Sequence, residues 1–374
     1  MRIAVIGLGA IGSQALLHLS QQEGVHAVGY DLYSPGHGFG ASGGENRLFS
    51  RVGADYENYT ELMDYALSQW ELLERDSGRT IVKRAGYLSV SDEAAASRNR
   101  ILQGAATGDS PARVLSRAQL QEEFGFQSYR EGDVGAFDPT GGMIRTDAAI
   151  FEAARAAVAL GAELRLGSRV TGLEPTASGV RVQLGEEGHD FDLVVLTTGP
   201  WVHQLLPQLE TTVHVHRPTS AWFLPKDART MRDLPALARE GEQQFYAAPT
   251  WDGASLKVGY GGLRQLSIAG GPRPEDTLID PRELGEFPQI LGECLTGFDP
   301  APFRIAHFFE GYTDSSRPVI QHVRDRVVAG VGFSGLGFKL SPVFGRLVAE
   351  TVLERPSELL RPMREAISEL PIDG

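Results

Sequence analysis

Three glycines near the N-terminus have the spacing of a turn that binds a nucleotide. They lie in the segment Gly7-Leu8-Gly9-Ala10-Ile11-Gly12, between an apolar run at residues 1–6 and a helical apolar pattern at residues 13–20. This context predicts a strand, a tight turn and a helix whose N-terminus can approach a pyrophosphate. Asp31 ends the next strand-like run, where its carboxylate can accept ribose hydroxyls. A plain βα turn followed by a solvated aspartate is the alternative, but strand, spacing and acid occur together here, which favours nucleotide binding.

A second glycine-rich segment lies near the C-terminus. Residues 330–339 read Gly-Val-Gly-Phe-Ser-Gly-Leu-Gly-Phe-Lys and also predict a strand-to-helix turn. A nicotinamide dehydrogenase usually completes its dinucleotide site within one contiguous domain. A flavin enzyme of the glutathione-reductase type instead brings a C-terminal segment back over the flavin ring. The pair of turns therefore predicts FAD as the cofactor.

Composition and charge exclude several classes of protein. The 374 residues are 42% hydrophobic, which is enough for a large core and two or three domain equivalents. A net charge of −13 without a basic stripe opposes nucleic-acid binding. The only cysteine, Cys294, excludes an internal disulfide, and the chain has no Cys/His spacing typical of a metal site. Because glycine or charged residues interrupt the apolar stretches, we expect no signal peptide, no membrane segment and a cytoplasmic protein.

Local patterns predict helices and strands between the two turns. Ser116 and Gln119 have the spacing of a capping box, and Thr146 can cap an Ala-rich helix over residues 147–160. The strands predicted from apolar runs span residues 162–166, 170–173, 180–184 and 193–198. From about residue 213 to 309, strand-like runs with frequent Pro and Gly predict a further sheet that covers the cofactor.

The order of these elements predicts an α/β fold with α+β elements, in two interleaved domains. The first is a glutathione-reductase-type Rossmann domain that binds FAD. The second is a substrate domain built on a mixed, largely antiparallel sheet. The predicted boundaries are 1–84, 141–212 and 310–374 for the FAD domain, and 85–140 and 213–309 for the substrate domain.

Further segments carry a resemblance to a known family that spans nearly the whole chain. They are Gly43-Gly44-Glu45-Asn46-Arg47, Tyr59 with Trp70, Gly199-Pro200-Trp201, Tyr246, Lys257-Val258-Gly259-Tyr260 and the run at 332–339. With them, the chain resembles the monomeric sarcosine oxidase and N-methyltryptophan oxidase group of the FAD-dependent glycine and D-amino-acid oxidase family. The resemblance implies a monomer that oxidises an amine beside a carboxylate to an imine. It also implies that molecular oxygen reoxidises the flavin and gives hydrogen peroxide.

The resemblance assigns roles to individual residues. The implied cofactor contacts are Gly7, Gly9, Ala10, Ile11, Gly12, Asp31, Ser42, Gly43, Arg47, Leu48, Val170, Gly199, Trp201, Gly335, Gly337, Phe338 and Lys339. The candidate catalytic residues are Lys257, Lys339, Tyr246 and Arg51, and we expect no metal.

The two lysines have distinct expected roles. The resemblance implies that Lys339 pairs with the substrate carboxylate, and because a helix N-terminus disfavours cations, this role is favoured over a lysine that snorkels at a helix start. Lys257 alternates with apolar neighbours on a predicted strand, so it faces either solvent or the flavin. The resemblance implies that its charge activates oxygen where superoxide forms. Tyr246 and Tyr260 either line the substrate pocket or pack in a core with a satisfied hydroxyl.

Three departures from the family pattern affect the expected site. The relatives have a second carboxylate-binding arginine where this chain has Ser50 followed by Arg51, so Arg51 either replaces that arginine or lies at the surface. Gly261-Gly262 replaces a histidine that contacts the substrate, which predicts a larger or differently shaped pocket. Glu310 stands where the flavin-attached cysteine of the relatives would fall, so we expect FAD to bind non-covalently.

The sequence thus favours an FAD-dependent oxidase of an N-substituted, cyclic or primary amino acid. A flavin dehydrogenase with another electron acceptor is an alternative, although it would not need an oxygen-activating cation at Lys257. A non-catalytic flavin-binding protein is the alternative outside the enzymes, supported by Ser50 and the missing histidine. An NAD-dependent dehydrogenase would lack the yellow colour of a flavin.

Overall fold

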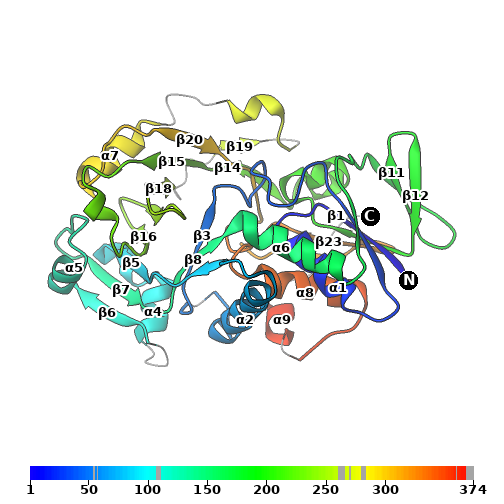
Figure 1. Ribbon diagram of the computed structural model, residues 1–374, viewed down its shortest axis with the longest axis horizontal. Helices are drawn as coiled ribbons and strands as arrows, with labels where there is room; N and C mark the ends of the chain where they lie inside the picture. Colours follow the sequence, from blue (N-terminus) through cyan, green and yellow to red (C-terminus); the bar gives the residue numbers. More distant parts are fainter. Residues whose placement is uncertain are drawn as a thin grey trace.

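The computed structural model of the protein describes residues 1–53, 55–56, 58–106, 111–259, 266–268, 271–278, 284–358 and 360–367. Within these ranges the chain forms two parts that lie side by side, each built on one large sheet (Figure 1). We call them the six-stranded part and the eight-stranded part.

The six-stranded sheet has the strand order β22-β23-β13-β1-β2-β9, and only the β22 to β23 pair among these neighbours is antiparallel. Ile3 and Val5 of β1 face one core, whereas Ala4 and Ile6 face another on the opposite side. Burial on both faces explains why these strands are apolar throughout. The strands are β1 (Arg2–Ile6), β2 (His26–Tyr30), β9 (Glu163–Arg165), β13 (Leu193–Leu196), β22 (Val319–Arg324) and β23 (Val327–Val331).

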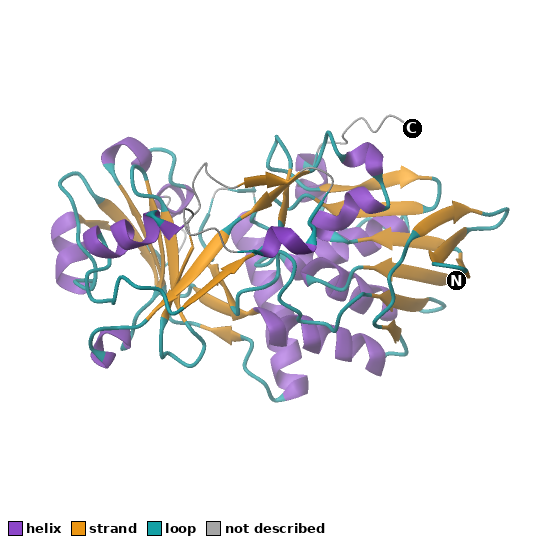
Figure 2. Ribbon diagram, turned by 90° about the horizontal axis from the view of Figure 1, so that it is seen from above, coloured by secondary structure: helices purple, strands orange, loops and turns teal. Residues whose placement is uncertain are grey.

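Helices cover one face of this sheet (Figure 2). The helix that follows β1 packs against both the helix before β9 and the helix after β23. No helix within the described ranges has both the length and the apolar character needed to cross a membrane. The helices are α1 (Ala10–Ser20), α2 (Tyr59–Ser77), α6 (Thr146–Ala159), α8 (Ser341–Val352) and α9 (Arg361–Ala366).

A small antiparallel sheet and two short 3-10 helices cover the other face. Val180, Val182 and Phe191 of the small sheet pack on the side of β1 that carries Ala4 and Ile6. The elements are β10 (Gly172–Pro175), β11 (Val180–Leu184), β12 (Glu187–Phe191), η1 (Gly199–Gln204) and η2 (Pro207–Leu209).

The eight-stranded sheet has the order β20-β15-β18-β17-β16-β5-β7-β6 and is mixed, because β16 pairs with β5 in parallel and the other pairs are antiparallel. Helices pack at its ends and on one face (Figure 1). The strands are β5 (Tyr87–Ser91), β6 (Arg113–Ser116), β7 (Val134–Asp138), β15 (Thr219–Phe223), β16 (Ala236–Glu240), β17 (Phe245–Pro249), β18 (Leu256–Gly259) and β20 (Arg304–His307). The helices are α3 (Glu93–Ala96), α4 (Arg100–Ala106), α5 (Arg117–Glu123) and α7 (Glu286–Glu293), and two further short 3-10 helices are η3 (Ala228–Met231) and η4 (Pro274–Thr277).

Two three-stranded sheets complete the described fold, with β3 and β8 lying between the two parts (Figure 1). The strand order of one sheet is β3-β8-β4, and that of the other is β19-β14-β21. Their strands are β3 (Asn46–Phe49), β4 (Val82–Lys83), β8 (Gly142–Arg145), β14 (His214–Arg217), β19 (Leu266–Ile268) and β21 (Glu310–Tyr312). Strands β3 and β21 each contribute a charged side chain, Arg47 and Glu310, to the cavity described below.

Candidate cofactor and active site

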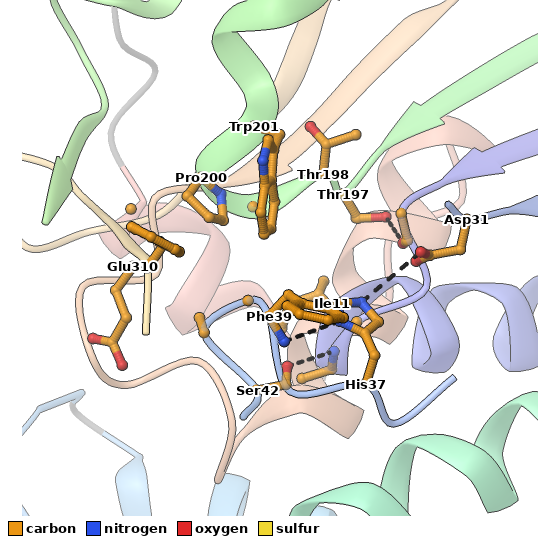
Figure 3. A pocket seen from close by; sticks show the side chains of 18 of the residues that line it. Ile11, Asp31, His37, Phe39, Ser42, Thr197, Thr198, Pro200, Trp201 and Glu310 are labelled. Atoms are coloured by element: carbon orange, nitrogen blue, oxygen red, sulfur yellow. Dashed lines mark hydrogen bonds and ion pairs between the residues drawn. The ribbon is translucent and has the colours of Figure 1, made fainter. Parts of the chain in front are cut away.

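A cavity of about 610 Å³ opens at the carboxyl ends of four parallel strands. Its walls include Gly7 after β1, Asp31 after β2, Thr197 after β13 and Gly332 after β23. This edge of an open α/β sheet is where ligands bind, because the loops there surround a crevice that the sheet itself leaves free. Asp31 and Glu310 lie at opposite ends of the cavity (Figure 3).

The N-terminal glycine turn has the close packing that its sequence predicts. Gly7 has a φ of 92°, and a Cβ atom on Gly12 would lie 1.8 Å from the carbonyl oxygen of Gly7. Gly9 caps α1 without a side-chain hydrogen bond, while the Ala10 N–H donates to Ser42 Oγ at 3.2 Å. The positive N-terminus of α1 is therefore directed at the cavity wall, where it can stabilise phosphate groups.

Asp31 is held in a fixed orientation at the end of β2. Its Oδ2 accepts the Leu8 N–H at 2.7 Å, and its Oδ1 accepts the Tyr33 N–H at 2.8 Å. The carboxylate is nearly buried and lines the cavity. Two backbone bonds leave further lone pairs on the oxygens, which can accept two ribose hydroxyls.

The C-terminal glycine turn lies on the same cavity. Gly332, Gly335 and Gly337 line it, and a Cβ atom on Gly337 would lie 2.7 Å from Phe333 Cβ. Phe338 stacks on the buried ring of Trp70, with ring centroids 6.4 Å apart. The two turns predicted from opposite ends of the sequence thus face one ligand site.

Arg47 brings a positive charge to the cavity wall from β3. Its NH1 donates to the Asn46 carbonyl at 2.9 Å, and its NH2 donates to the Ala41 carbonyl. At this end of the cavity, Glu310 accepts a hydrogen bond from the Tyr312 hydroxyl at 2.9 Å. The wall there combines a cation with a carboxylate.

Lys257 lies directly behind Arg47 and is almost completely buried, with 1% of the residue exposed. Its Nζ donates to the Gly44 carbonyl at 2.8 Å and to the Asn46 carbonyl at 3.1 Å, so both cations share the oxygen of Asn46. Burial, followed by the Arg47 guanidinium, lowers the pKa of Lys257 well below its ordinary value, while Glu45 and Glu310 act against this shift.

Tyr246 lies beside Lys257. The Lys257 ammonium is 5.9 Å from the centroid of its ring, and the Tyr246 hydroxyl is 3.3 Å from Ser220 Oγ. Burial raises the pKa of Tyr246, although Arg47 acts in the opposite direction. Neither Lys257 nor Tyr246 forms part of the cavity wall itself. Tyr260 and Gly261-Gly262 lie outside the described residues.

Lys339 precedes the N-cap residue of α8, Leu340, and is partly buried. Its Nζ lies 5.4 Å from the ring centroid of Tyr59. Burial opposes its charge, but the neighbouring Tyr59, Asp55 and Tyr87 together raise the pKa of Lys339 above its ordinary value. The raised pKa favours the charged form of Lys339, which does not itself line the cavity.

Arg51 points away from the cavity. Its Nε and NH2 donate to the two carboxylate oxygens of Asp64 on α2, at 2.5 and 2.6 Å. Ser50 Oγ and the Arg51 N–H both donate to Asp138 Oδ2 at 2.8 Å, which holds this stretch of backbone in place. The sequence left Arg51 either in the substrate site or at the surface. The structure has it at the surface, where its guanidinium forms a bidentate ion pair with the Asp64 carboxylate.

Most of the expected cofactor contacts line the cavity, and four do not. Those on the wall are Gly7, Gly9, Ala10, Ile11, Asp31, Ser42, Arg47, Val170, Gly199, Trp201, Gly335, Gly337 and Phe338. Gly12, Gly43, Leu48 and Lys339 are absent from it. Close packing explains the glycines at two of these positions, since a Cβ atom on Gly12 would lie 1.8 Å from the Gly7 carbonyl oxygen and one on Gly43 would lie 2.4 Å from the Gly38 carbonyl oxygen.

The sequence patterns did not indicate several residues of the wall. Thr197 and Thr198 directly follow the apolar strand β13, which is the signal that could have identified them. Tyr33, His37 and Phe39 follow Asp31 in an irregular loop, for which periodicity provides no signal.

Comparison with known proteins identifies the family. A model of the family described as FAD dependent oxidoreductase matches residues 2–351. The chain belongs to this family. Monomeric sarcosine oxidase of Streptomyces avermitilis is 26% identical over 359 residues, which cover 94% of this chain and 93% of that protein. N-methyl-L-tryptophan oxidase of Yersinia pestis is 26% identical over 371 residues, which cover 96% of both. These relatives confirm the resemblance that the motifs indicate.

Solved structures confirm the fold class. The open form of NikD, described as an unusual amino acid oxidase essential for nikkomycin biosynthesis, matches with a TM-score of 0.79 and 22% identity, over 95% of this chain and 94% of that chain. L-proline dehydrogenase from P. horikoshii matches with a TM-score of 0.78 and 20% identity, over 99% of both chains.

FAD is the cofactor of this FAD-dependent oxidoreductase, and the cavity fits it. Asp31 can hold the ribose, and the N-terminus of α1 can hold the pyrophosphate. The turns present backbone without side chains to the cavity at Gly7, Gly9, Gly335 and Gly337. When bound, FAD accepts the two electrons of the oxidation, which protein side chains cannot do.

Gly12→Ala should weaken FAD binding about 10- to 100-fold, because the added methyl group must displace the Gly7 carbonyl by overpacking that costs about 1–3 kcal/mol. The measurement is the ratio of flavin to protein absorbance after dialysis, together with titration by FAD. Gly292→Ala is the matched control, since a Cβ atom there meets nothing within 4 Å. Equal FAD affinity in the two variants would contradict the role of this turn in binding FAD.

Proposed function

We propose that the protein oxidises the C–N bond of an N-substituted, cyclic or primary amino acid to an imine and reduces oxygen to hydrogen peroxide. The observation that carries the proposal is the buried side chain of Lys257, which donates to two backbone carbonyls behind the cavity wall and shares one of them with Arg47. The names of the relatives, a sarcosine oxidase and an N-methyl-L-tryptophan oxidase, support the substrate class and the oxidase assignment.

We assign a separate role to each charged side chain near the cavity. Lys257 acts here in its charged form, which its two carbonyl acceptors, Glu45 and Glu310 favour against the effect of burial. Together with Arg47 it concentrates positive charge where oxygen accepts electrons, and a preorganised charge in a poorly solvated site stabilises the developing anion. Lys339 holds the carboxylate of the substrate, which orients the C–H bond to be oxidised. Arg51 is left out of this site because Asp64 occupies its guanidinium. The division into an FAD domain and a substrate domain at the boundaries given above is part of the proposal.

The direct test is a screen for peroxide. Purified protein containing FAD is mixed in air with sarcosine, N-methyl-L-tryptophan, cyclic amino acids and D-amino acids, and peroxide is measured with a coupled peroxidase. Peroxide in proportion to the substrate consumed supports the proposal. If substrates reduce the flavin without peroxide, while an artificial acceptor restores turnover, the protein is a dehydrogenase and the oxidase proposal is wrong.

Lys257→Met should slow the reoxidation of reduced flavin by oxygen about 100-fold or more, while anaerobic reduction by substrate stays close to the wild-type rate. The methionine fills similar space but removes the buried charge. Both half-reactions are measured by stopped-flow absorbance. Lys226→Met, at an exposed lysine, is the control and should affect neither. Equal slowing of the two half-reactions would rule out the oxygen role.

Lys339→Ala should raise the apparent dissociation constant about 10- to 100-fold for an amino acid, and much less for the corresponding amine without a carboxylate. The reason is that only the amino acid offers an anion to the ammonium. Binding is followed by the change in flavin absorbance in the absence of oxygen. An equal loss for both ligands would show that Lys339 acts on the structure of the site and not on the carboxylate.

FAD should be released intact when the protein is denatured in acid. Cys294 is the only cysteine, and it is buried in the core of the eight-stranded part with its Sγ 2.6 Å from Gln243 Oε1, away from the cavity wall. Centrifugation after precipitation should therefore leave the yellow colour in the supernatant. A flavin adduct in the intact mass of the denatured chain would disprove non-covalent binding. His37 would then be the next candidate for the residue that attaches the flavin.

A further inference from the structure

A histidine on the cavity wall takes no part in the proposed oxidation. His37 lies opposite Asp31, with its Nε2 3.8 Å from Asp31 Oδ1, and both side chains are largely buried (Figure 3). The Phe39 N–H donates to His37 Nδ1 at 3.2 Å. Because Nδ1 accepts this bond, the single proton of the neutral ring must be on Nε2, where it faces the carboxylate.

The loop around His37 leaves the ring little freedom. Its centroid lies 4.9 Å from that of Tyr33 and 5.9 Å from that of Phe39, and these two rings are themselves 4.5 Å apart. Gly36 has a φ of 85°, and a Cβ atom there would lie 2.9 Å from the Asp147 carbonyl oxygen at the start of α6. The two aromatic rings, which are themselves exposed, and the close contact with α6 together keep the ring of His37 beside Asp31.

We propose that His37 positions the ribose-binding carboxylate of Asp31 and that its protonation releases FAD. The neutral ring presents one N–H to Asp31 and leaves the carboxylate able to accept ribose hydroxyls. A protonated ring has a second N–H at Nδ1, which would face the Phe39 N–H donor and disrupt that bond. The charged ring would also compete with the ribose for Asp31, and bound FAD would bury the charge further.

The direction of the pH effect follows from the surroundings of His37. Burial lowers the pKa of His37, and the opposing effect of Asp31 is smaller. The other charged and titratable groups around His37 and the cavity are the Arg145 and Asp147 pair at the start of α6, Tyr33 against the ring, and Arg47, Arg169, Arg273 and Glu310 on the cavity wall. Because this pKa is lowered, the neutral, FAD-binding arrangement persists as the pH falls through the ordinary histidine value of about 6.5, and it is lost only at a lower pH.

The test measures FAD affinity and needs no substrate, so its outcome is independent of the proposed oxidase activity. The full-length protein with FAD is diluted at a series of pH values between about 5 and 8, and released FAD is measured by its fluorescence. The dissociation constant of the wild type should rise as the pH falls, by up to about tenfold per pH unit. It should stay flat for His37→Gln, which retains an N–H donor, and for His37→Phe, which retains the ring stack.

Two controls separate this role from a general effect of acid. His322→Gln, at an exposed histidine on β22, should keep the pH dependence of the wild type. Asp31→Asn should weaken FAD binding at every pH, and adding His37→Gln to it should have no further effect, since His37 acts through the carboxylate. The proposal is overturned if both His37 variants keep the wild-type pH dependence, or if His37→Gln weakens binding equally with and without Asp31.

Discussion

Close contact between α1 and α8 is the constraint on which the cofactor site depends. Gly345 of α8 lies so near α1 that a Cβ atom on it would be 2.4 Å from Gln14 Cβ and 2.8 Å from the Ala15 nitrogen. The helices can approach this closely only because residue 345 has no side chain. Each helix follows one of the glycine turns, so their contact places turns from opposite ends of the chain on the same cavity.

Since the turns carry few side chains, the charges of the site come from neighbouring elements. The most demanding of these is Lys257, because a buried ammonium is costly unless its N–H groups find acceptors. Gly44, with a φ of 89°, provides both the space and an acceptor: a Cβ atom there would lie 3.1 Å from Lys257 Nζ and 2.9 Å from the Phe308 ring. The backbone that presents Arg47 to the cavity thus also holds Lys257 behind it.

Features set by neighbouring residues could be predicted from the sequence. The capping box at Ser116 and Gln119 is present at the start of α5. The helix predicted over residues 147–160 is α6, but Thr146 is its first residue and does not cap it. The Thr146 N–H instead donates to the Glu45 carbonyl at 2.9 Å, a contact between residues far apart in the sequence. Tertiary packing has replaced the local cap here, and sequence spacing cannot reveal such a replacement.

The same limit applies to the charged residues that the sequence suggests for the site. Spacing predicts both glycine turns and Asp31, since a strand, a turn and a helix N-terminus are local features. Alternation on a strand allows the Lys257 side chain to face either solvent or the interior. Which side it faces depends on how the segment before and at β3 packs against β18. The sequence likewise leaves two places open for Arg51, and the choice depends on Asp64 of α2, which turns the guanidinium outward. Sequence spacing therefore predicts where the dinucleotide binds, whereas the placement of Lys257 and Arg51 depends on contacts between distant segments.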